Sequence, residues 1–463
     1  MSQHASGELL YPLDARPGYA EATFAAIQHV LASFVGIITP TLIIGGVLGL
    51  AEHIPYLISM ALIVSGVGTF IQARRPFGVG AGMICVQGTS FAFLSSVLAA
   101  GFIAKARGGG PDEILSLIFG VCFLGAFVEI VLSQFLHKLK RIITPLVTGI
   151  VITIIGISLI KVGMTDLAGG FKAPDFGSPA NLALGGFVLV LIIALNFSSN
   201  AWLRLSSIVI GLLAGSAIAF FMGKISFDHL ANLPLVSIPV PFRYGFSFDW
   251  GAFAPIALIY LITAIESTGD LTANSVICRQ PIQGDVYIRR IRGGVLGDGI
   301  NSALAAVFNT FPNTTFSQNN GVIQLTGVAS RHVGYYISAI LVLLGLFPVI
   351  GGVLQQIPKP VLGGATLVMF GTVAAAGVKI LANEELDRRK LLIMAVAFGL
   401  GLGVMNAELL AQMPTLVQNI FGSPITTGGL AAILLSLLLP AGDSCSEAKQ
   451  RPAADATAGD TAN

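Results

Sequence analysis

Charged residues are scarce in this sequence. Lys, Arg, Asp and Glu make up 10% of the 463 residues, whereas soluble domains carry roughly 25%. Hydrophobic residues make up 54%, and the mean hydropathy is +0.84. This composition excludes an ordinary soluble domain and predicts an integral membrane protein. The formal net charge of +2 gives no indication of a nucleic-acid partner.

Cysteine is also rare. The four cysteines, Cys85, Cys122, Cys278 and Cys445, are too far apart in sequence to form a metal or redox motif. We interpret them as small buried side chains, and we expect no bound metal and no organic cofactor. Residues 1–21 lack the basic stretch and the compact apolar stretch of a cleaved signal peptide. The first helix is therefore expected to insert uncleaved.

Long apolar runs are abundant, and Gly and Pro interrupt them. The 55 Gly and 22 Pro are spread through these runs, as in kinked or broken membrane helices. About fourteen runs are long enough to span a membrane. In the first half they cover residues 22–45, 54–73, 78–104, 113–136, 142–163, 180–199 and 203–223. In the second half they cover residues 251–274, 291–309, 313–329, 333–353, 359–382, 391–407 and 424–440.

Lys and Arg are divided unequally between the two sides that this segmentation defines. With the N-terminus inside, 18 of the 25 Lys and Arg fall on the cytoplasmic side and 7 fall outside, which satisfies the positive-inside rule. Both termini are therefore predicted to be cytoplasmic. Because each half contains an odd number of spans, the halves are predicted to be inverted in the membrane. PLVTG at 145–149 and PVLGG at 360–364, which open the fifth and twelfth runs, support two related halves.

Two runs carry polar residues at their centres. The third contains residues 87–90 (QGTS), and the tenth contains residues 317–321 (SQNNG). Gln318 follows Gln87 by 231 positions, about half the chain. Short, Gly-interrupted segments at matching positions of two inverted halves point to the binding site of a transporter. We expect an extended lead-in to each helix. Helix N-termini near Thr89 and Asn320 would then face carbonyl oxygens or an anionic edge of a ligand.

Three acidic residues lie within otherwise apolar runs. Glu266 and Asp270 lie one helical turn apart in the eighth run, and Asp298 lies in the ninth. Ionisable groups at bilayer depth are costly unless they are paired or solvated, so they indicate a functional site. Glu266 can accept from two N–H donors of a planar heterocycle, and desolvation favours a protonated form that could take part in a proton cycle. A bridge to a neighbouring helix stays open for Asp298, and an orienting role stays open for Asp270.

Amide, imidazole and aromatic side chains supply further candidates. Gln318 and Asn319 offer donor and acceptor pairs suited to the edge of a purine or pyrimidine. His29 in the first run is a candidate proton carrier, and Phe91 could stack on a flat ring. Structural roles stay open for all four, as partners of broken backbone, hydrogen-bond partners or core side chains. Glu129 in the fourth run is interpreted as structural.

Residues 318–327, QNNGVIQLTG, resemble the signature of the nucleobase-ascorbate transporter family (nucleobase:cation symporter-2). That signature reads Gln, Glu or Pro, then Asn, any residue, Gly, four of any kind, Thr, and Arg, Lys or Gly. The resemblance covers nearly the whole chain, through segments such as QHVLASFVGIITP, ITPLVTGIV, AIESTGD, CRQPIQGD and GLFPVIGG, and looks closest to bacterial xanthine permeases. It implies an all-α polytopic fold of fourteen spans in a seven-plus-seven inverted repeat, with short β-like stretches in spans 3 and 10.

The resemblance also implies a core domain and a gate domain that move in an elevator-like way within a homodimer. The expected boundaries are a cytoplasmic tail at 1–21, core at 22–137, gate at 138–224, an outer loop at 225–250, core at 251–353, gate at 354–440 and a disordered cytoplasmic tail at 441–463.

Two sets of site residues follow from the resemblance. The substrate-binding set comprises Glu266, Gln318, Ser317, Phe91, Ser90 and Thr89. The set for proton coupling and support of the site comprises Asp298, which matches the essential ninth-span acid, together with Asp270, Asn319, His29, Gly321 and Thr326. Xanthine-selective relatives often carry Asn at the position of Ser90, and the smaller hydroxyl side chain leaves room for an 8-oxo group. Uric acid is therefore a further candidate substrate.

We expect a proton-coupled symporter, not an enzyme, that imports an oxidised purine, first xanthine and then uric acid, across the bacterial inner membrane. The nearest alternative is a uric acid-preferring or broader purine/uracil permease. A transporter of the same fold for small anions predicts a basic residue at the midplane, where this chain has acids. An intramembrane aspartyl protease using Asp270 and Asp298 needs a GxGD motif, and residues 295–298 (VLGD) lack its first Gly.

Overall fold

The computed structural model describes residues 9–136, 144–170, 173–225, 233–405, 410 and 412–440. The expected tail at 441–463, the first part of the N-terminal tail and part of the loop at 225–250 lie outside the described residues.

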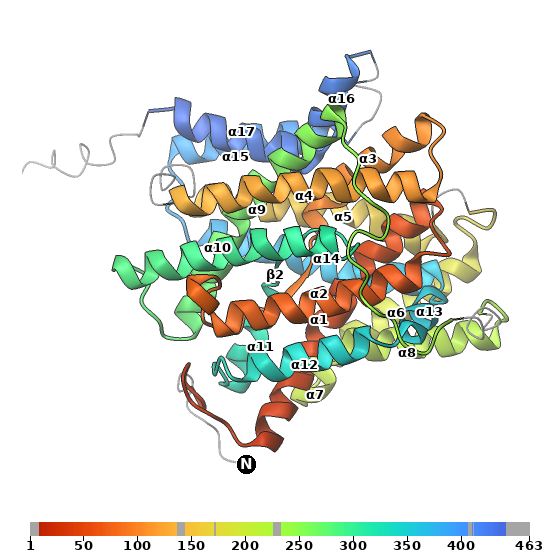
Figure 1. The fold of residues 1–463 in the computed structure, drawn as a ribbon, viewed down its shortest axis with the longest axis horizontal. Coiled ribbons are helices and arrows are strands. Elements are labelled where there is room, and N and C mark those ends of the chain that lie inside the picture. The colour runs from red at the N-terminus through yellow and green to blue at the C-terminus, as the bar shows by residue number, and fades with distance from the viewer. Residues whose placement is uncertain are drawn as a thin grey trace, which may run out of the picture.

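The described chain is mostly helical, with two short strands (Figure 1). The first half contains α1 (Tyr19–Leu48), α2 (Ile54–Arg74), η1 (Pro76–Gly78), β1 (Gln87–Thr89), η2 (Phe91–Phe93), α3 (Leu94–Ala106), α4 (Pro111–Phe135), α5 (Pro145–Leu167), α6 (Pro179–Asn196), α7 (Ala201–Leu205) and α8 (Ser207–Phe221). The second half contains α9 (Trp250–Ile277), α10 (Gly284–Val307), β2 (Asn313–Thr315), α11 (Gln318–Thr326), α12 (Val333–Gly345), α13 (Pro348–Gln355), α14 (Lys359–Ala382), α15 (Arg388–Gly403), α16 (Thr415–Phe421) and α17 (Pro424–Leu438).

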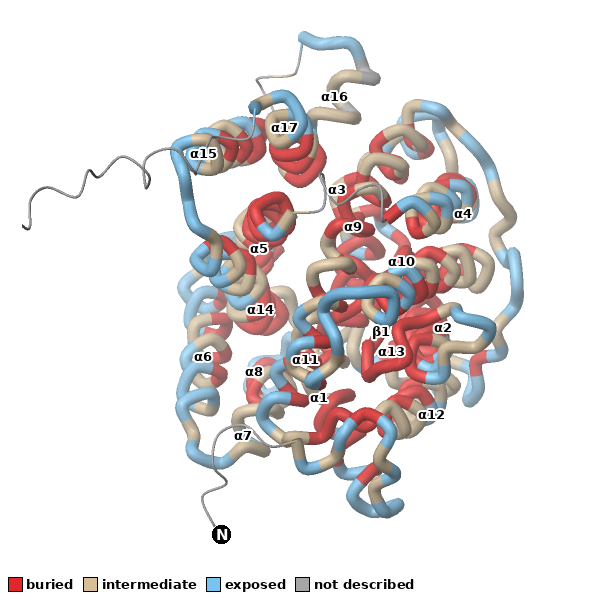
Figure 2. Tube along the Cα trace, turned by 90° about the vertical axis from the view of Figure 1, so that its left-hand side faces the viewer, coloured by how far each residue is buried: buried red, intermediate tan, exposed pale blue. Residues whose placement is uncertain are grey.

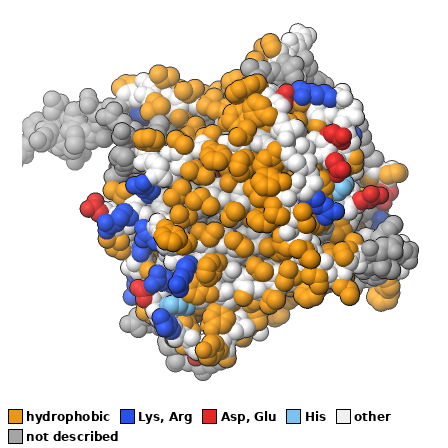
Figure 3. Space-filling model, viewed as in Figure 1, with side chains coloured by type: hydrophobic (Ala, Val, Ile, Leu, Met, Phe, Trp, Pro, Cys, Tyr) orange, Lys and Arg blue, Asp and Glu red, His pale blue; other side chains and the backbone are white. Residues whose placement is uncertain are grey.

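Within the described residues, seven helices are long and apolar enough to cross a membrane. They are α1, α2, α4, α5, α6, α9 and α14, and the bent pair of α12 and α13 is an eighth candidate. The shorter apolar helices α3, α8 and α17 coincide with three more of the predicted runs. Apolar side chains cover the middle of the face in Figure 3, and most charged side chains lie toward its ends. The prediction of a mostly helical, polytopic membrane protein is confirmed.

One predicted run is not a single helix. The sequence predicts one span over 333–353, but α12 and α13 meet there at 74°. Pro348 lies in the first turn of α13. Because proline has no backbone N–H to continue a helix, the chain breaks before it and starts again.

The helices that follow the polar interruptions also begin elsewhere than predicted. After β1 the chain forms η2 from Phe91 and α3 from Leu94, because strand pairing continues through Thr89. In the second half α11 begins at Gln318, two residues before the predicted Asn320.

Two groups of helices lie side by side in Figure 2. In one group, α5 packs against α14 and α17, α6 packs against α8 and α14, and α15 packs against α17. In the other group, α2 packs against α1, α10 and α12, and α4 packs against α9 and α10. The contacts of α9 with α5 and α17 join the two groups.

Glycines allow α5 and α14 to approach each other closely. A Cβ at Gly156 of α5 would overlap the backbone of Ala374, and a Cβ at Gly377 of α14 would lie 2.5 Å from the backbone nitrogen of Thr153. These pairs run in opposite order along the two helices, so α5 and α14 are antiparallel. The PLVTG and PVLGG segments begin these helices. The two similar segments therefore start two neighbouring helices that run in opposite directions.

A side-chain cap fixes the start of α9, the helix that carries Glu266. The Oδ1 of Asp249 accepts a 2.9 Å hydrogen bond from the N–H of Ala252, one of the otherwise unpaired N–H groups of the first turn. Arg107 forms a 2.6 Å ion pair with the same carboxylate. The hydrogen bond from Arg107 holds the pKa of the Asp249 carboxyl below its ordinary value.

Candidate functional site

The two polar interruptions meet as paired strands. β1 and β2 are antiparallel, with Gly88 opposite Thr314, and every residue of both strands is buried. Gly88 lies against the ring of Phe316, where a Cβ would overlap the ring carbons. The predicted extended lead-ins are confirmed, and the two halves of the chain each contribute one.

Asp298 of α10 is fully buried beside these strands. Its Oδ1 accepts hydrogen bonds from the Nε2 atoms of Gln72 at 2.6 Å and Gln87 at 2.7 Å, and from Thr315 Oγ1 at 3.0 Å. Its Oδ2 accepts from Ser267 Oγ at 2.5 Å and from the Thr315 N–H at 3.3 Å. We call these five residues the Asp298 cluster. It joins α2, α9 and α10 to both strands through one carboxylate.

The sequence predicts only Asp298 of this cluster as a site residue. Gln87 belongs to the recognised interruption, but its role as a partner of Asp298 has no local signal. Gln72 lies near the end of an apolar run. A polar residue in that setting is the signal that could have marked it as a site residue. Ser267 directly follows Glu266, and only the packing of α9 on α10 shows that its hydroxyl group faces Asp298.

Glu266 lies on α9, which contacts η2, β2 and α11. The residue is half-buried, and its Oε2 is buried without a hydrogen-bond partner among the described residues. Asp270, one turn later, is 6% exposed. Its carbonyl oxygen accepts a 3.4 Å hydrogen bond from Nδ2 of Asn320. α9 and α11 are therefore in direct contact, and Glu266 retains an oxygen that can accept hydrogen bonds.

Gln318 opens α11, with Ser317 as the preceding N-cap residue, and both are half-buried. No hydrogen bond joins the Gln318 amide to the described residues. Asn319 donates from Nδ2 to Nδ1 of His29 at 3.0 Å and to the carbonyl oxygen of His29 at 3.2 Å. An amide N–H can only donate, so this geometry places the acceptor on Nδ1 of His29. The structure thus pairs two predicted support residues directly.

The substrate-binding candidates from the first half lie just after β1. Phe91 packs edge-on against Phe370 of α14, with ring centroids 5.2 Å apart and an interplanar angle of 83°. Phe370 is a neighbour that the sequence missed, because an aromatic residue in an apolar run carries no special signal. Ser90 and Thr89 are buried, and the Ser90 N–H donates to the carbonyl oxygen of Pro312 at 2.8 Å.

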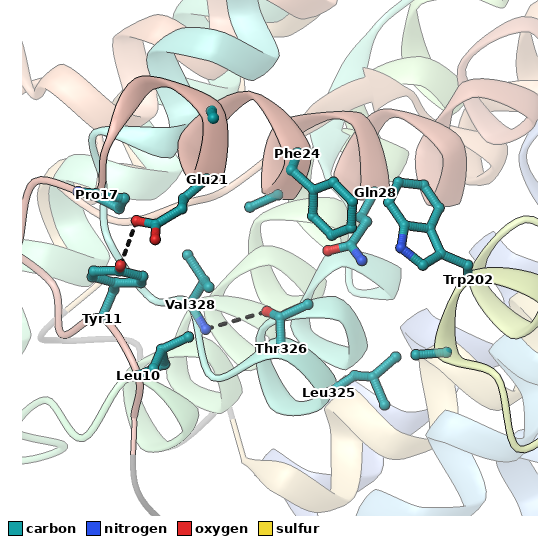
Figure 4. Close-up of a pocket in the computed structure, with 13 residues that line it drawn as sticks. Leu10, Tyr11, Pro17, Glu21, Phe24, Gln28, Trp202, Leu325, Thr326 and Val328 are labelled. Atoms are coloured by element: carbon teal, nitrogen blue, oxygen red, sulfur yellow. Dashed lines mark hydrogen bonds between the residues drawn. The ribbon is translucent and has the colours of Figure 1, made fainter. Parts of the chain in front are cut away.

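Two further signature positions, Gly321 and Thr326, lie farther along α11. Gly321 is exposed, and a Cβ there would meet no atom within 4 Å, so packing does not require glycine. Thr326 Oγ1 donates to the carbonyl oxygen of Val322 at 2.8 Å and accepts from the N–H of Val328 at 3.2 Å (Figure 4). Thr326 therefore secures the end of the helix.

The predicted burial of the cysteines is confirmed for three of the four. Cys85, Cys122 and Cys278 are free and buried, as predicted, whereas Cys445 lies outside the described residues. The described residues contain no group of three or more His, Cys, Asp or Glu placed to bind a metal ion. Glu129 of α4 is 1% exposed, and its Oε1 has no hydrogen-bond partner among the described residues.

Acids buried between packed apolar helices, together with strand-interrupted helices that meet from the two halves of the chain, define a membrane transporter. Two solved structures have a similar fold. The transmembrane domain of the cyanobacterial bicarbonate transporter BicA matches with a TM-score of 0.52 and 14% identity, over 89% of this chain and 98% of that chain. SLC26A9 matches with a TM-score of 0.57 and 13% identity, over 89% of this chain and 64% of that chain. At these identities the likeness concerns the fold alone.

Sequence relatives are much closer. A model described as a permease family matches residues 20–410. The xanthine permease XanP of Escherichia coli (strain K12) is 46% identical over 446 residues, or 95% of this chain and 96% of XanP. The xanthine permease XanQ of the same strain is 45% identical over 444 residues, or 95% of each chain. The uric acid permease PucJ of Bacillus subtilis (strain 168) is 35% identical over 421 residues, or 89% of this chain and 91% of PucJ.

The chain belongs to the xanthine/uracil permease family. It is a multi-pass membrane transporter and not an enzyme, which removes the aspartyl protease alternative.

Proposed function

We propose that this protein imports xanthine across the bacterial inner (plasma) membrane together with protons, and that uric acid is its next best substrate. The support for this order is that two relatives at 45–46% identity are xanthine permeases, whereas the uric acid permease is 35% identical. A uric acid-preferring or broader purine/uracil permease remains the alternative that substrate competition tests.

The observation that carries the proposal is the pair of unsatisfied polar side chains on contacting helices. Glu266 of α9 has a buried oxygen without a partner, and Gln318 of α11 has no hydrogen bond to the described residues. A 2,6-dioxopurine presents N–H donors that suit the carboxylate and carbonyl oxygens that suit an amide N–H. Phe91, Thr89, Ser90 and Ser317 would complete the site around the ring.

Glu266 then has two tasks, binding the purine and taking part in the proton cycle. The sequence also predicts a role in proton coupling for Asp298. Its carboxylate already accepts from five donors, so the protein itself uses its hydrogen-bonding capacity, which favours the structural alternative. We therefore propose that Asp298 holds the site together, while Asp270 and the pair of Asn319 and His29 support the orientation of α9 and α11.

The proposed architecture has fourteen crossings in a seven-plus-seven inverted repeat, with both termini cytoplasmic and a homodimer as the working unit. The two helix groups of Figure 2 support a core domain at 22–137 and 251–353 and a gate domain at 138–224 and 354–440. Elevator-like motion of one group past the other would carry the purine between the two sides. The contact of Phe91 with Phe370 would lie on the surface that moves.

The buried charges argue against the alternative of a small-anion transporter. Among the described residues on the apolar spans, the fully or nearly buried charged side chains in the middle of the helices are acids: Glu129, Asp270 and Asp298. The one buried Arg in the described part of the chain, Arg290, lies in the first turns of α10 and donates to Gln280 at 3.0 Å. No basic side chain of the described spans is thus offered to an anion beside Glu266.

Uptake of labelled xanthine into cells or proteoliposomes tests the proposal. We expect saturable uptake that an uncoupler abolishes and that unlabelled uric acid inhibits more weakly than xanthine does. Glu266→Gln should lower binding of xanthine roughly 10- to 150-fold, since a hydrogen bond to a charged group contributes about 1.5–3 kcal/mol. Glu113→Gln, in the exposed first turn of α4, is the matched control and should transport normally. Absence of purine uptake, or normal uptake by Glu266→Gln, would contradict the proposal.

A further inference from the structure

A cavity lies away from Glu266, toward the side that the charge distribution predicts to be cytoplasmic. It has a volume of about 560 Å³ and is bounded by the segment before α1, by α1, by α7 and by the end of α11 (Figure 4). Tyr11, Glu21, Phe24, Gln28, Trp202 and Thr326 line it. We call it the Gln28 cavity. Its volume lies within the range of about 300–1,000 Å³ that is usual for small-molecule sites.

The Gln28 cavity is separate from the proposed substrate site but adjoins it. Gln318 begins α11 and Thr326 ends it, so the rise of 1.5 Å per residue separates the two ends by about 12 Å. Two consecutive residues of α1 contact the proposed substrate site and the Gln28 cavity, respectively. His29 binds Asn319 at the substrate site, and Gln28 lines the cavity.

The polar feature of this cavity is a buried amide. Gln28 is 5% exposed, and no hydrogen bond joins its side chain to the described residues. Figure 4 shows its amide beside the cavity, between Phe24 and Trp202. Its amide is therefore free to exchange hydrogen bonds with a molecule in the cavity. It presents a donor and an acceptor side by side, which match the adjacent N–H and C=O groups of a lactam.

The apolar feature is a pair of rings that joins α1 to α7, the short helix that packs against α6 and α8 of the other helix group. Phe24 of α1 and Trp202 of α7 lie edge to face, with centroids 4.4 Å apart and an interplanar angle of 79°. The side chain of Asn200 caps α7 by accepting from the Trp202 N–H at 2.9 Å, which fixes the backbone beneath the indole. A flat heterocycle whose edge meets Gln28 can place its face against either ring.

Tyr11, Glu21 and Thr326 on the wall already have partners. Tyr11 donates its hydroxyl hydrogen to the Glu21 carboxylate, and the N–H of Gly18 donates to the same oxygen at 3.2 Å. The Tyr11 backbone is held by hydrogen bonds to residues 327 and 329. Thr326 is occupied at the end of α11. The Gln28 amide and the indole N–H of Trp202 are therefore left on the wall to recognise a polar ligand.

We propose that the Gln28 cavity is a second, weaker site for an oxopurine, occupied as the substrate passes between Glu266 and the cytoplasm. Gln28 binds the lactam edge of the purine, and Trp202 and Phe24 contact its face. This proposal rests on the proposed function, because it takes the same substrate class. A lipid acyl chain is the competing occupant, since the remaining lining is mostly apolar.

Trp202 provides the test. The chain has two Trp residues, and Trp250 lies at the start of α9 with 73% exposure. In purified Trp250→Phe protein, excited near the red edge of indole absorption, Trp202 is the single reporter. We expect saturable quenching by xanthine that persists when Glu266→Gln is added. Trp202→Phe, which leaves only Trp250, is the matched control for light absorption by xanthine and should show no saturable change.

Two further variants test the assigned contacts. Gln28→Leu should raise the xanthine concentration that gives half-maximal quenching of Trp202 at least tenfold. If that variant does not fold, Phe24→Ala at a half-exposed position should weaken it several-fold. Loss of the Trp202 response in Glu266→Gln protein, or quenching by brominated phospholipid but not by xanthine, would overturn the proposal. Binding of labelled xanthine to Trp250→Phe protein, measured separately, distinguishes failure of the second site from failure of the proposed function. If xanthine binds but does not quench Trp202, only the second site is refuted. If no purine binds at all, the proposed function is refuted as well.

Discussion

Asp298 and Glu266 are acids of the same helix group with opposite surroundings. Asp298 accepts hydrogen bonds from Gln72, Gln87, Ser267 and Thr315, whereas Glu266 keeps a buried oxygen without a partner among the described residues. A carboxylate surrounded by donors is stable only while they all remain in place. A carboxylate with an unused oxygen is ready for a ligand or a proton. The difference separates the acid that builds the site from the acid that uses it.

The largest effect is expected at the acid that builds the site. Asp298→Ala leaves the neutral donors of the Asp298 cluster buried and unpaired, and each buried donor left without a partner costs about 1–3 kcal/mol. We expect a large fall in thermal stability of the purified protein and loss of transport. Glu266→Gln should lose transport while its melting temperature stays close to that of the parent.

If Asp298→Ala melted at the parental temperature, the hydrogen bonds of the Asp298 cluster would not be stabilising, and the contrast between the two acids would fail. Ser267→Ala, which removes one donor and leaves the other partners, provides an intermediate measurement. We expect it to destabilise the protein by about 1–3 kcal/mol.

A middle-sized effect is expected at Ser90, which follows the strand that supplies Gln87 to the Asp298 cluster. Ser90 is buried, with its backbone tied to Pro312, so a larger side chain there has to occupy space near the substrate. Ser90→Asn should reduce inhibition of xanthine uptake by uric acid, by roughly tenfold if the lost fit is about 1.4 kcal/mol. Unchanged competition would remove Ser90 from the selectivity of the site. Ser95→Asn, in the first turn of α3, controls for general crowding.

The smallest effect is expected at Glu129. This buried acid also has an oxygen without a partner among the described residues, so no hydrogen bond to that oxygen is lost when the carboxyl is replaced by an amide. We expect Glu129→Gln to change the free energy of unfolding by less than about 1 kcal/mol, measured by chemical or thermal denaturation. A loss as large as that of Asp298→Ala would show that Glu129 belongs with the acids that build the site.

Much of the site was accessible from the sequence because its residues are anomalous for their setting. Glu266, Asp270 and Asp298 stand out in apolar runs, and the polar interruptions mark the strands that precede α3 and α11. The partners of Asp298 could not be predicted. Gln72 and Gln87 are 226 and 211 residues away from it, and the choice of partner depends on the rotation of α2 and on the register of β1 with β2.

The same limit applies at the contacts between helix groups. Phe91 predicts a ring beside the substrate, but its contact with Phe370 depends on how α14 packs. Gln28 is next to a recognised candidate, His29, and yet nothing in the local sequence indicates that its amide shares a cavity with Trp202. An aromatic residue in an apolar helix has the same local pattern whether it faces lipid, a neighbouring helix or a ligand.

By itself, the sequence determined that the chain is a helical membrane protein, where most of its apolar segments lie, and that acids and broken segments interrupt them. Hydropathy reports these features because the cost of placing a polar group in hydrocarbon is local to each residue. Only the tertiary structure decided that Asp298 is saturated with donors, that Glu266 is not, and that Gln28 lines a cavity away from Glu266. Those outcomes depend on which side chains distant segments bring within hydrogen-bond distance, and that is a property of packing.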